Sequence, residues 1–530
     1  MRHRNRPIPG ADDRYLHERC KVAPSPEAQA RLRDKLRDMA DRAGLPAGQV
    51  GLIPLDRGGY NDGMIRPGSD LPLGTPLRVA RRAALERAPL RGQVRVLVVL
   101  VDFSDKAMTA TPQHFQDLFF STGKLPHGSV REYYKEVTGG KITITGEVVG
   151  PFRMPLPLTT YAGGQSGTDN PAPNARTMAR EAAVQADAVV DYKPYDNDGN
   201  GFVDAFIVVH AGRGAEETLD PNDIWSHKWV FNNGALNADG TKVFGYLTVP
   251  EDSKIGVCAH ELGHLLFGWP DLYDTDDSSS GLGNWCLMAG GSWNGDGDIP
   301  AHPSAWCKAT QDWVTTVNRT TSGTLTIADV KTGKKVYRLW KDGITAQEYF
   351  LVEHRAQTKY DAKLPGEGLL VYHVDDSIEG NDNEHHPQVK LIEADGRKHL
   401  EDGANRGDAG DPFPGSSNNA NLTATTTPNS LAYSGLETCV SLTSIVKSGA
   451  SIKAKVSVSC PLHVAPPQVR PIAGTATNTR KTKKTRPGKK ARPTRKARPT
   501  KKTRPARKAR PATKAKAATR RRASKKPARR

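Results

Sequence analysis

The chain has 530 residues, which is long enough for several domains and a large buried core. Its net charge of +19 suggests binding to a polyanion, but 26 of the 76 Lys and Arg residues lie in residues 480–530, where no Asp or Glu occurs. Residues 1–479 carry the other 50 basic residues against 57 acidic ones, a net charge of −7. The sequence therefore predicts a mildly acidic globular body followed by a cationic tail. No apolar run approaches the roughly 18 residues of a membrane span, so no transmembrane segment is expected.

The first residues lack the pattern of a secretory signal, because Arg2, Arg4 and Arg6 are followed by prolines and acidic residues in place of an apolar core. Residues 1–90 are predicted to form a leader or pro-segment. Within it, Ser25 can cap a helix that runs to about residue 43 and places apolar side chains on one face, namely those of Leu32, Leu36 and Met39. Sequence rich in Gly and Pro then separates the leader from the next segment.

Residues 91–318 alternate between strand-like and helix-like segments, which predicts an α/β domain. The apolar run 94–103 is typical of a strand buried on both faces, and further strands are expected over 141–149 and 202–209. Helices are expected over 115–120, 129–137, 176–190 and 257–267.

The sequence pattern changes over residues 319–462, where turn residues separate short strand-like segments. These segments are 335–339, 349–353, 369–373, 442–446 and 452–458. They predict a β-rich, sandwich-like accessory domain, in which Cys439 and Cys460 bracket two strands and can form a disulfide. A second disulfide between Cys286 and Cys307 is a similar expectation. Residues 463–530 are dominated by Pro, Ala, Thr, Lys and Arg, which predicts a disordered tail.

The motif that carries chemistry is H-E-x-x-H at residues 260–264. On a helix, residues i and i+4 share a face, so His260 and His264 can bind one ion, and zinc suits such ligands. Glu261 then lies beside the metal and can act as general base. The alternative, two histidines on the surface of an amphipathic helix, is disfavoured because the helix is too apolar to lie at the surface.

A catalytic zinc needs a third protein ligand, and no glutamate occurs between Glu261 and Glu348. The helix instead leads into G-W-P-D-L-Y-D at residues 268–274. A glycine that turns the chain back, with a ligand three residues later, is the arrangement of metzincins with Asp in place of His. Asp271 is the first candidate for the third ligand and Asp274 the second. Met288 stands where metzincins have their Met-turn.

These residues resemble those of the immune inhibitor A-type secreted zinc metallopeptidases of bacteria. The resemblance rests on HELGHLLFGWPDLYDTD from His260, GLGNWCLMAGGSWNG from Gly281, SVREYYKEVTGGKITITG from Ser129 and DNDGNGFVDAFIVVHAG from Asp196. EYFLVEHR, LPGEGLLVYHVD and DPFPG match more loosely further along the chain. The resemblance covers about residues 90–430, with one residue more between the second histidine and the glycine than is usual in metzincins. It implies a metzincin-like zinc endopeptidase that acts on protein substrates.

In the mechanism that follows, a metal-activated water attacks the peptide bond while Glu261 accepts its proton. A second donor is usually needed to stabilise the oxyanion. His227 and Tyr273 are candidates for this donor, although both can equally be packed aromatic residues.

A second metal site is predicted between residues 196 and 204. This loop has oxygen-bearing residues at positions 1, 3, 5 and 9 of a calcium loop and glycine at position 6, but Ile207 at position 12 excludes an EF-hand. A structural calcium is expected there, and an ordinary Asp/Asn/Gly-rich turn is the alternative. Its candidate ligands are Asp196, Asp198, Asn200, Phe202 and Asp204.

The leader and the tail offer two further functional elements. A cysteine in a leader can occupy the open coordination position of a zinc peptidase and keep it latent, so Cys20 is a candidate for this role, although a disulfide or an ordinary thiol is a plainer interpretation. Residues 480–530 should attract any polyanion, with no aromatic residue for base stacking.

The leading hypothesis is a monomeric zinc endopeptidase that is secreted, as the family resemblance implies, with a cytoplasmic location as the alternative. A second hypothesis is a polyanion- or nucleic-acid-binding protein that acts through its basic tail and has an inactive peptidase-like body. An inactive peptidase fold that serves as an adhesin is a third, and the intact H-E-x-x-H motif argues against it.

Overall fold

The computed structural model describes residues 20–43, 90–199 and 201–460, all of which fall within one compact unit, Met1–His463. The predicted tail, residues 463–530, lies outside the described residues, as do Asn200 of the predicted calcium loop and most of the leader. Among the helices that are described, none has an apolar stretch long enough to cross a membrane.

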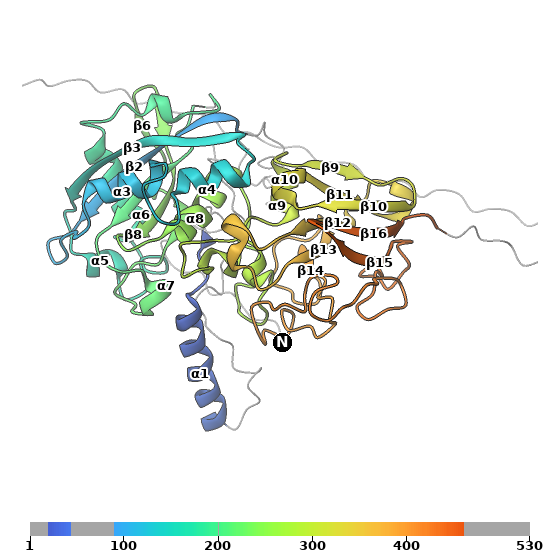
Figure 1. The fold of residues 1–530 in the computed structure, drawn as a ribbon. Helices are drawn as coiled ribbons and strands as arrows, with labels where there is room; N and C mark the ends of the chain where they lie inside the picture. The colour runs from blue at the N-terminus through green and yellow to red at the C-terminus, as the bar shows by residue number, and fades with distance from the viewer. Residues whose placement is uncertain (1–19, 44–89, 200, 461–530) are drawn as a thin grey trace, which may run out of the picture. The chain divides into compact units, whose positions relative to one another are not determined.

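A six-stranded sheet organises the first half of the chain, with the strand order β1-β5-β8-β4-β2-β3 (Figure 1). Strands β3, β2, β4 and β8 run parallel to one another. Strand β5 is antiparallel to β8, and β1 is antiparallel to β5. The bounds of these strands are β1 Cys20–Lys21, β2 Gly92–Asp102, β3 Ile142–Arg153, β4 Phe206–His210, β5 His227–Val230 and β8 Gly245–Pro250. A short hairpin, β6 Leu236–Ala238 and β7 Thr241–Val243, joins β5 to β8.

Helices cover both faces of this sheet, because β2 is apolar on both sides. Val96, Val98 and Leu100 pack in one core cluster with α3, α4 and α8, whereas Leu97 and Val99 pack in the other with α5 and α6. The helices are α3 Pro112–Phe120, α4 Val130–Val137, α5 Leu158–Ala162, α6 Ala175–Ala186, α7 Ala215–Thr218, α8 Ile255–Phe267 and α9 Ala305–Thr310. The prediction of a mixed domain of strands and helices is confirmed.

Two of the predicted elements are shorter than expected. Helix α6 ends at Ala186 and not at residue 190, with Asp187 as its C-cap. Strand β4 begins at Phe206 and not at residue 202, because the preceding loop folds back on itself and Phe202 makes only an isolated bridge to Lys242. The predicted elements include neither β5 nor β8, although both strands belong to the central sheet.

The second half of the chain is rich in β-structure, as predicted. It contains a five-stranded sheet of order β14-β13-β12-β11-β9 and a three-stranded sheet of order β10-β16-β15, whose buried residues belong to one core cluster. The strands are β9 Thr315–Asn318, β10 Gly323–Ala328, β11 Lys335–Leu339, β12 Glu348–Arg355, β13 Gly368–Asp375, β14 Val389–Leu391, β15 Ser441–Ser448 and β16 Ser451–Ser457, with the short helix α10 Val330–Gly333 between β10 and β11. Because β9 pairs with β11, strand pairing places the start of this region before residue 319.

The cysteines divide into one disulfide and four thiols. The predicted Cys439–Cys460 disulfide is present and holds the end of β16 close to the segment that leads into β15. The predicted Cys286–Cys307 disulfide is wrong: both residues are buried thiols that contact each other through a hydrogen bond.

The described part of the leader packs against the first half of the chain. Ser25 accepts a hydrogen bond from the backbone N–H of Ala28 at 3.1 Å and begins α1, Pro26–Ala43, as predicted. Just before this helix, β1 adds a strand to the central sheet beside β5. Residues 20–21 therefore extend the central sheet on the side where β5 lies.

Candidate active site

Helix α8 carries the H-E-x-x-H motif, and all of its residues are buried. The helix ends at Gly268, whose φ of 66° lies in the left-handed region and lets the chain turn back, as the sequence predicted. The imidazole rings of His260 and His264 lie side by side on one face, with their centroids 4.7 Å apart.

Both histidines are oriented by backbone carbonyl groups. The Nδ1 atom of His260 lies 2.9 Å from the Leu287 carbonyl, and Nδ1 of His264 lies 2.6 Å from the Trp269 carbonyl. A carbonyl can only accept, so each Nδ1 carries the hydrogen and each Nε2 presents a lone pair. The two Nε2 atoms lie only 3.0 Å apart.

Asp271 completes this group of atoms. Its Oδ1 lies 3.0 Å from Nε2 of His260 and 3.1 Å from Nε2 of His264, and the residue is 1% exposed. Burial opposes charge on His264, but the neighbouring Cys20 and Asp271 outweigh it and raise the pKa of His264 well above its usual range. Burial and the charge of His264 together lower the pKa of His260.

Asp274, the second candidate for the third ligand, is engaged elsewhere. Its carboxylate accepts hydrogen bonds from the backbone N–H of Asp276 at 3.2 Å and of Ser279 at 3.0 Å, and from the hydroxyl of Ser278 at 2.8 Å. Burial raises its pKa to about 7. The structure therefore brings Asp271, and not Asp274, to the two histidines.

Glu261 is fully buried, and neither of its carboxylate oxygens has a hydrogen-bond partner among the described residues. Burial raises its pKa well above the usual range. Burying a carboxylate without a hydrogen-bond partner lowers the stability of the fold, so such a residue indicates a reactive role and not a structural one.

The segment around Met288, the predicted Met-turn residue, packs against α8. A Cβ atom on Gly263 would lie 2.6 Å from Sδ of Met288, so any larger residue there would require the Met288 side chain to shift. The carbonyl of Met288 accepts a hydrogen bond from the backbone N–H of Leu272 at 2.6 Å. This turn thus supports both the histidine helix and the chain that carries Asp271.

The two candidate oxyanion donors are placed differently. The ring nitrogens of His227 lie 2.6 Å from the Trp225 carbonyl and 2.8 Å from the Tyr246 hydroxyl, so both contact protein groups. The Tyr273 hydroxyl donates to the backbone carbonyl of Lys21 at 2.7 Å. Tyr273 therefore already binds a peptide carbonyl, and that carbonyl belongs to the leader.

Cys20 lies in the same site. Its Sγ atom, a ring nitrogen of His264 and a carboxylate oxygen of Asp271 all lie within 4.8 Å of one another. Cys20 is 2% exposed and is present as a thiol. The leader cysteine thus reaches the group of candidate ligands from 240 residues away in the sequence.

In the loop predicted to bind calcium, three acidic side chains lie close together. Oxygen atoms of Asp196, Asp198 and Asp204 lie within 4.8 Å of one another. Asp196 also accepts a hydrogen bond from the backbone N–H of Gly201 at 2.9 Å, and Asp204 accepts one from that of Asn197 at 2.5 Å.

The sequence interpretation did not single out Glu393 and Asp395, which form another acidic group with Asp411 in the β-rich region. Burial and the neighbouring Asp411 raise the pKa of Glu393 to about 7. Glu393 and Asp395 are two residues apart, but Asp411 lies on a separate segment, so local spacing does not reveal the group.

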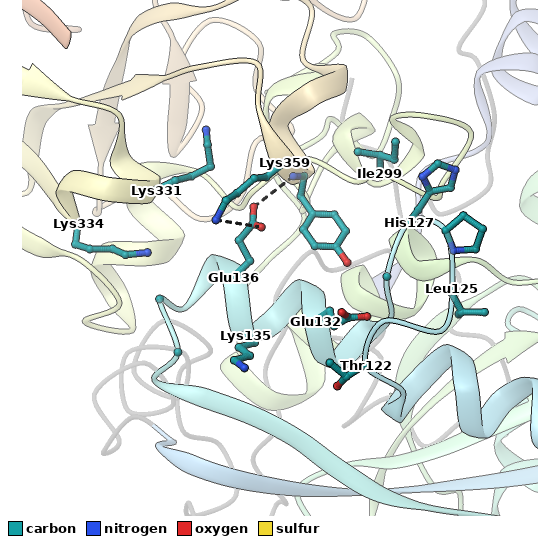
Figure 2. A pocket seen from close by; sticks show the side chains of 15 residues that line it. Thr122, Leu125, His127, Glu132, Lys135, Glu136, Ile299, Lys331, Lys334 and Lys359 are labelled. Atoms are coloured by element: carbon teal, nitrogen blue, oxygen red, sulfur yellow. Dashed lines mark hydrogen bonds and ion pairs between the residues drawn. The ribbon is translucent and has the colours of Figure 1, made fainter. Parts of the chain in front are cut away.

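A pocket of about 790 Å³ lies between α4 and the β-rich region, and Figure 2 shows its charged lining. Glu136 accepts a hydrogen bond from the backbone N–H of Tyr360 at 3.3 Å, and its carboxylate lies 3.8 Å from Nζ of Lys359. None of the residues that the sequence predicted for the site lines this pocket.

A metal ion fits the group formed by His260, His264 and Asp271. Two ring nitrogens and a carboxylate oxygen face one another at 3.0–3.1 Å, an arrangement that needs a cation among them, either a proton on His264, whose pKa is raised, or a metal ion. Two imidazoles and one carboxylate are ligands that zinc accepts in catalytic sites. The unpartnered Glu261 next to them suits a general base.

Comparison with known proteins agrees with this chemistry. The family described as the catalytic domain of immune inhibitor A peptidase M6 matches residues 87–319. The pre-pro-metalloprotease PrtV of Vibrio cholerae is 34% identical over an alignment of 273 residues that covers 40% of this chain and 29% of that protein. Immune inhibitor A of Bacillus thuringiensis is 30% identical over an alignment of 252 residues that covers 38% of this chain and 36% of that protein. The chain spans about a third of the length of these curated relatives. Over residues 87–319, the chain is similar to the catalytic domain of the immune inhibitor A peptidase M6 family.

Proposed function

We propose that the chain is a zinc-dependent endopeptidase with a metzincin-like catalytic domain. The observation that carries this proposal is the convergence of three ligand atoms, from His260, His264 and Asp271, beside a buried carboxylate without a partner. When bound there, zinc lowers the pKa of a coordinated water to about 7 and polarises the scissile carbonyl.

The residues of the chain perform the remaining steps. Glu261 accepts a proton from the attacking water and delivers it to the leaving amine. Its burial supports this role, since the raised pKa lets the carboxylate hold the proton between the two transfers. The carbonyls of Leu287 and Trp269 hold the two imidazoles in the tautomer that binds a metal.

Tyr273 is the better candidate of the two for the oxyanion donor. Its hydroxyl donates to a backbone carbonyl, which is the chemical group that it would meet in a substrate. His227 has Tyr246 on one side and the Trp225 carbonyl on the other, so we assign it to the support of β5.

We propose further that the chain acts on protein or peptide substrates, that it is secreted and that it is monomeric. The alternative is a polyanion-binding protein that acts through residues 480–530. It predicts salt-sensitive DNA binding, lost on deletion of these residues, in a chain without hydrolytic activity. The buried Glu261 and the ligand atoms beside it favour the peptidase.

Casein hydrolysis by the zinc-loaded chain tests the proposal. The assay uses the full chain and the chain cut by trypsin at the arginines within residues 78–91, so that a leader that blocks the site cannot hide the activity. A strong chelator should abolish hydrolysis, and added zinc should restore it. Failure of both forms to hydrolyse casein with one zinc bound per chain would reject the proposal.

The third ligand can be tested by two matched substitutions. Asp271→Asn should weaken zinc binding by at least about a hundredfold, because it replaces a charged ligand with a poor one. Asp274→Asn is the control and should leave the zinc affinity nearly unchanged, since an amide oxygen can still accept hydrogen bonds within the turn. Competition with a chromophoric chelator measures both affinities. The opposite order would assign the ligand to Asp274.

We also propose that calcium binds Asp196, Asp198 and Asp204, together with Asn200 and the carbonyl of Phe202. At a calcium concentration of a hundred times Kd, binding should stabilise the fold by about 2.7 kcal/mol. Thermal unfolding of the full chain, with calcium, magnesium or chelator, measures this effect. Asp204→Asn should remove most of the calcium-dependent shift. An equal Tm in calcium and chelator would indicate an ordinary Asp-rich turn.

A further inference from the structure

The backbone of the leader between Cys20 and Ser25 lies at the edge of the central sheet, beside β5. Cys20 pairs with Lys228 and Lys21 with His227, so the leader extends the sheet at its edge in the antiparallel direction. An extended peptide that adds a strand to a sheet edge is a common mode of peptide recognition. A protein substrate that bound beside β5 would need this same edge.

Contacts to the leader main chain come from several parts of the domain. Backbone carbonyls of Lys21, Val22 and Ala23 accept hydrogen bonds at 2.7–2.9 Å, and the donors are the side chains of Tyr273, Trp225 and Trp293. The N–H groups of Val22 and Ser25 donate to the carbonyls of Ser226 and Glu216 at 3.2 and 2.9 Å. These hydrogen bonds are made to the backbone of the leader and not to its side chains, as expected of a site that binds peptides.

This segment is also the most deeply buried part of the described leader. Cys20, Val22, Ala23 and Ser25 are between 1% and 5% exposed. Lys21 is 9% exposed, and its ammonium group lies 3.3 Å from Asp169. The segment thus pairs with the edge of β5, so another strand cannot pair with that edge while it is in place.

The side chain of Cys20 points to the atoms that would bind zinc. Its sulfur forms a group with His264 and Asp271 in which all ligand atoms lie within 4.8 Å, and it hydrogen-bonds His264. A thiolate is a strong zinc ligand, and a fourth protein ligand converts an open catalytic site into a closed one. The attacking water would then have no coordination position.

We propose that Cys20 is the fourth ligand of the metal in the full chain, and that residues 20–25 act as an inhibitory strand on the edge of β5 where a substrate would bind. The chain is therefore latent until this segment leaves. Helix α1 adds to the attachment, since Gln29 donates a hydrogen bond to Asp277 at 2.7 Å. The inference rests on the proposed zinc peptidase function.

Cobalt substitution tests the ligand without any need for activity. The full chain loaded with Co²⁺ should show a near-ultraviolet band from sulfur-to-cobalt charge transfer. Cys20→Ser should lose this band, whereas Cys307→Ser, which removes another buried thiol, should keep it. Absence of the band from the cobalt-loaded wild-type chain, or its persistence in Cys20→Ser, would overturn the proposal.

Casein hydrolysis by the uncut zinc-loaded chain tests the latency. Cys20→Ser should raise the rate by at least about tenfold, because an intramolecular ligand competes at an effective concentration on the order of millimolar. Adding Glu261→Gln to this variant should return the rate to background. Equal rates for the uncut wild type and Cys20→Ser would overturn latency and leave the peptidase proposal intact. A cobalt–thiolate band without hydrolysis by any form, including the trypsin-cut chain, would instead reject the peptidase and retain Cys20 as a ligand.

Discussion

Glu261→Gln should reduce casein hydrolysis by the zinc-loaded, trypsin-cut chain by about two to four orders of magnitude. The amide has nearly the same size as the carboxyl group, but it cannot accept the proton of the attacking water. Zinc content should stay at the wild-type level, because the three proposed ligands are untouched. Hydrolysis by the variant at the wild-type rate would show that another group, or another protein, performs the reaction.

The same substitution should leave the fold as stable as before, or more stable. Neither oxygen of Glu261 has a hydrogen-bond partner among the described residues, so glutamine replaces a carboxyl group whose charged form is disfavoured by burial, and breaks no contact. Loss of activity without loss of stability distinguishes a group kept for catalysis from one kept for structure.

Glu216→Gln is the matched control for this experiment. Glu216 is also a buried glutamate, with a pKa raised to about 7 by burial, but it accepts hydrogen bonds from the backbone N–H and the hydroxyl of Ser226. Its role in the structure is therefore to hold the segment that leads into β5. The variant should lose some stability and keep hydrolysis within about tenfold of wild type.

Much of the site could be predicted because its chemistry is local in sequence. Residues i and i+4 of a helix share a face, so the H-E-x-x-H pattern fixed the relation of His260, Glu261 and His264. Gly268 marked the end of that helix. The choice between Asp271 and Asp274 was harder, because both follow the glycine at ligand-like spacing and the backbone hydrogen bonds of the turn decide between them.

The parts that could not be predicted depend on contacts between distant segments. Strand β5 is only four residues long and carries a fully buried lysine, Lys228, so its local pattern does not indicate a strand of the central sheet. Without β5, the sequence gives no reason to place the leader beside it. The position of Cys20 next to His264 and Asp271 therefore became visible only in the folded chain.

A buried network of charges across the two halves of the chain is another such feature. Lys308 of α9 contacts Glu353 of β12 at 2.6 Å, and Glu353 contacts Arg355 at 3.2 Å. Asp361 accepts hydrogen bonds from Arg355 Nε at 2.7 Å and from Lys331 Nζ at 3.1 Å. All five side chains are at most 2% exposed.

This network also supports the floor of the candidate active site. Arg355 donates hydrogen bonds to the carbonyls of Trp285 and His302 at 3.4 Å, and Trp285 lies three residues before Met288. Asp361 accepts a further bond from the backbone N–H of His302 at 3.0 Å. The β-rich region is thus joined to the segment that packs under α8.

Asp361→Asn should therefore lower the free energy of unfolding by about 3–5 kcal/mol, the effect of removing one member of a buried ion pair. Burial opposes the charge of Asp361, but the Arg355 guanidinium beside it holds the pKa of this carboxylate well below its usual range. Asparagine keeps the shape of the side chain and leaves the buried Arg355 and Lys331 without this counter-charge. Urea unfolding of the full chain, followed by tryptophan fluorescence, measures the change.

Glu367→Gln is the matched control, since it removes one partner of an exposed ion pair with Lys447, whose side chains are 38% and 61% exposed. It should change the free energy of unfolding by less than about 1 kcal/mol, because water screens such pairs. If Asp361→Asn cost no more than this control, the network would contribute little to stability. In that case, the β-rich region could not hold the site through these charges, and its apolar core would have to do so alone.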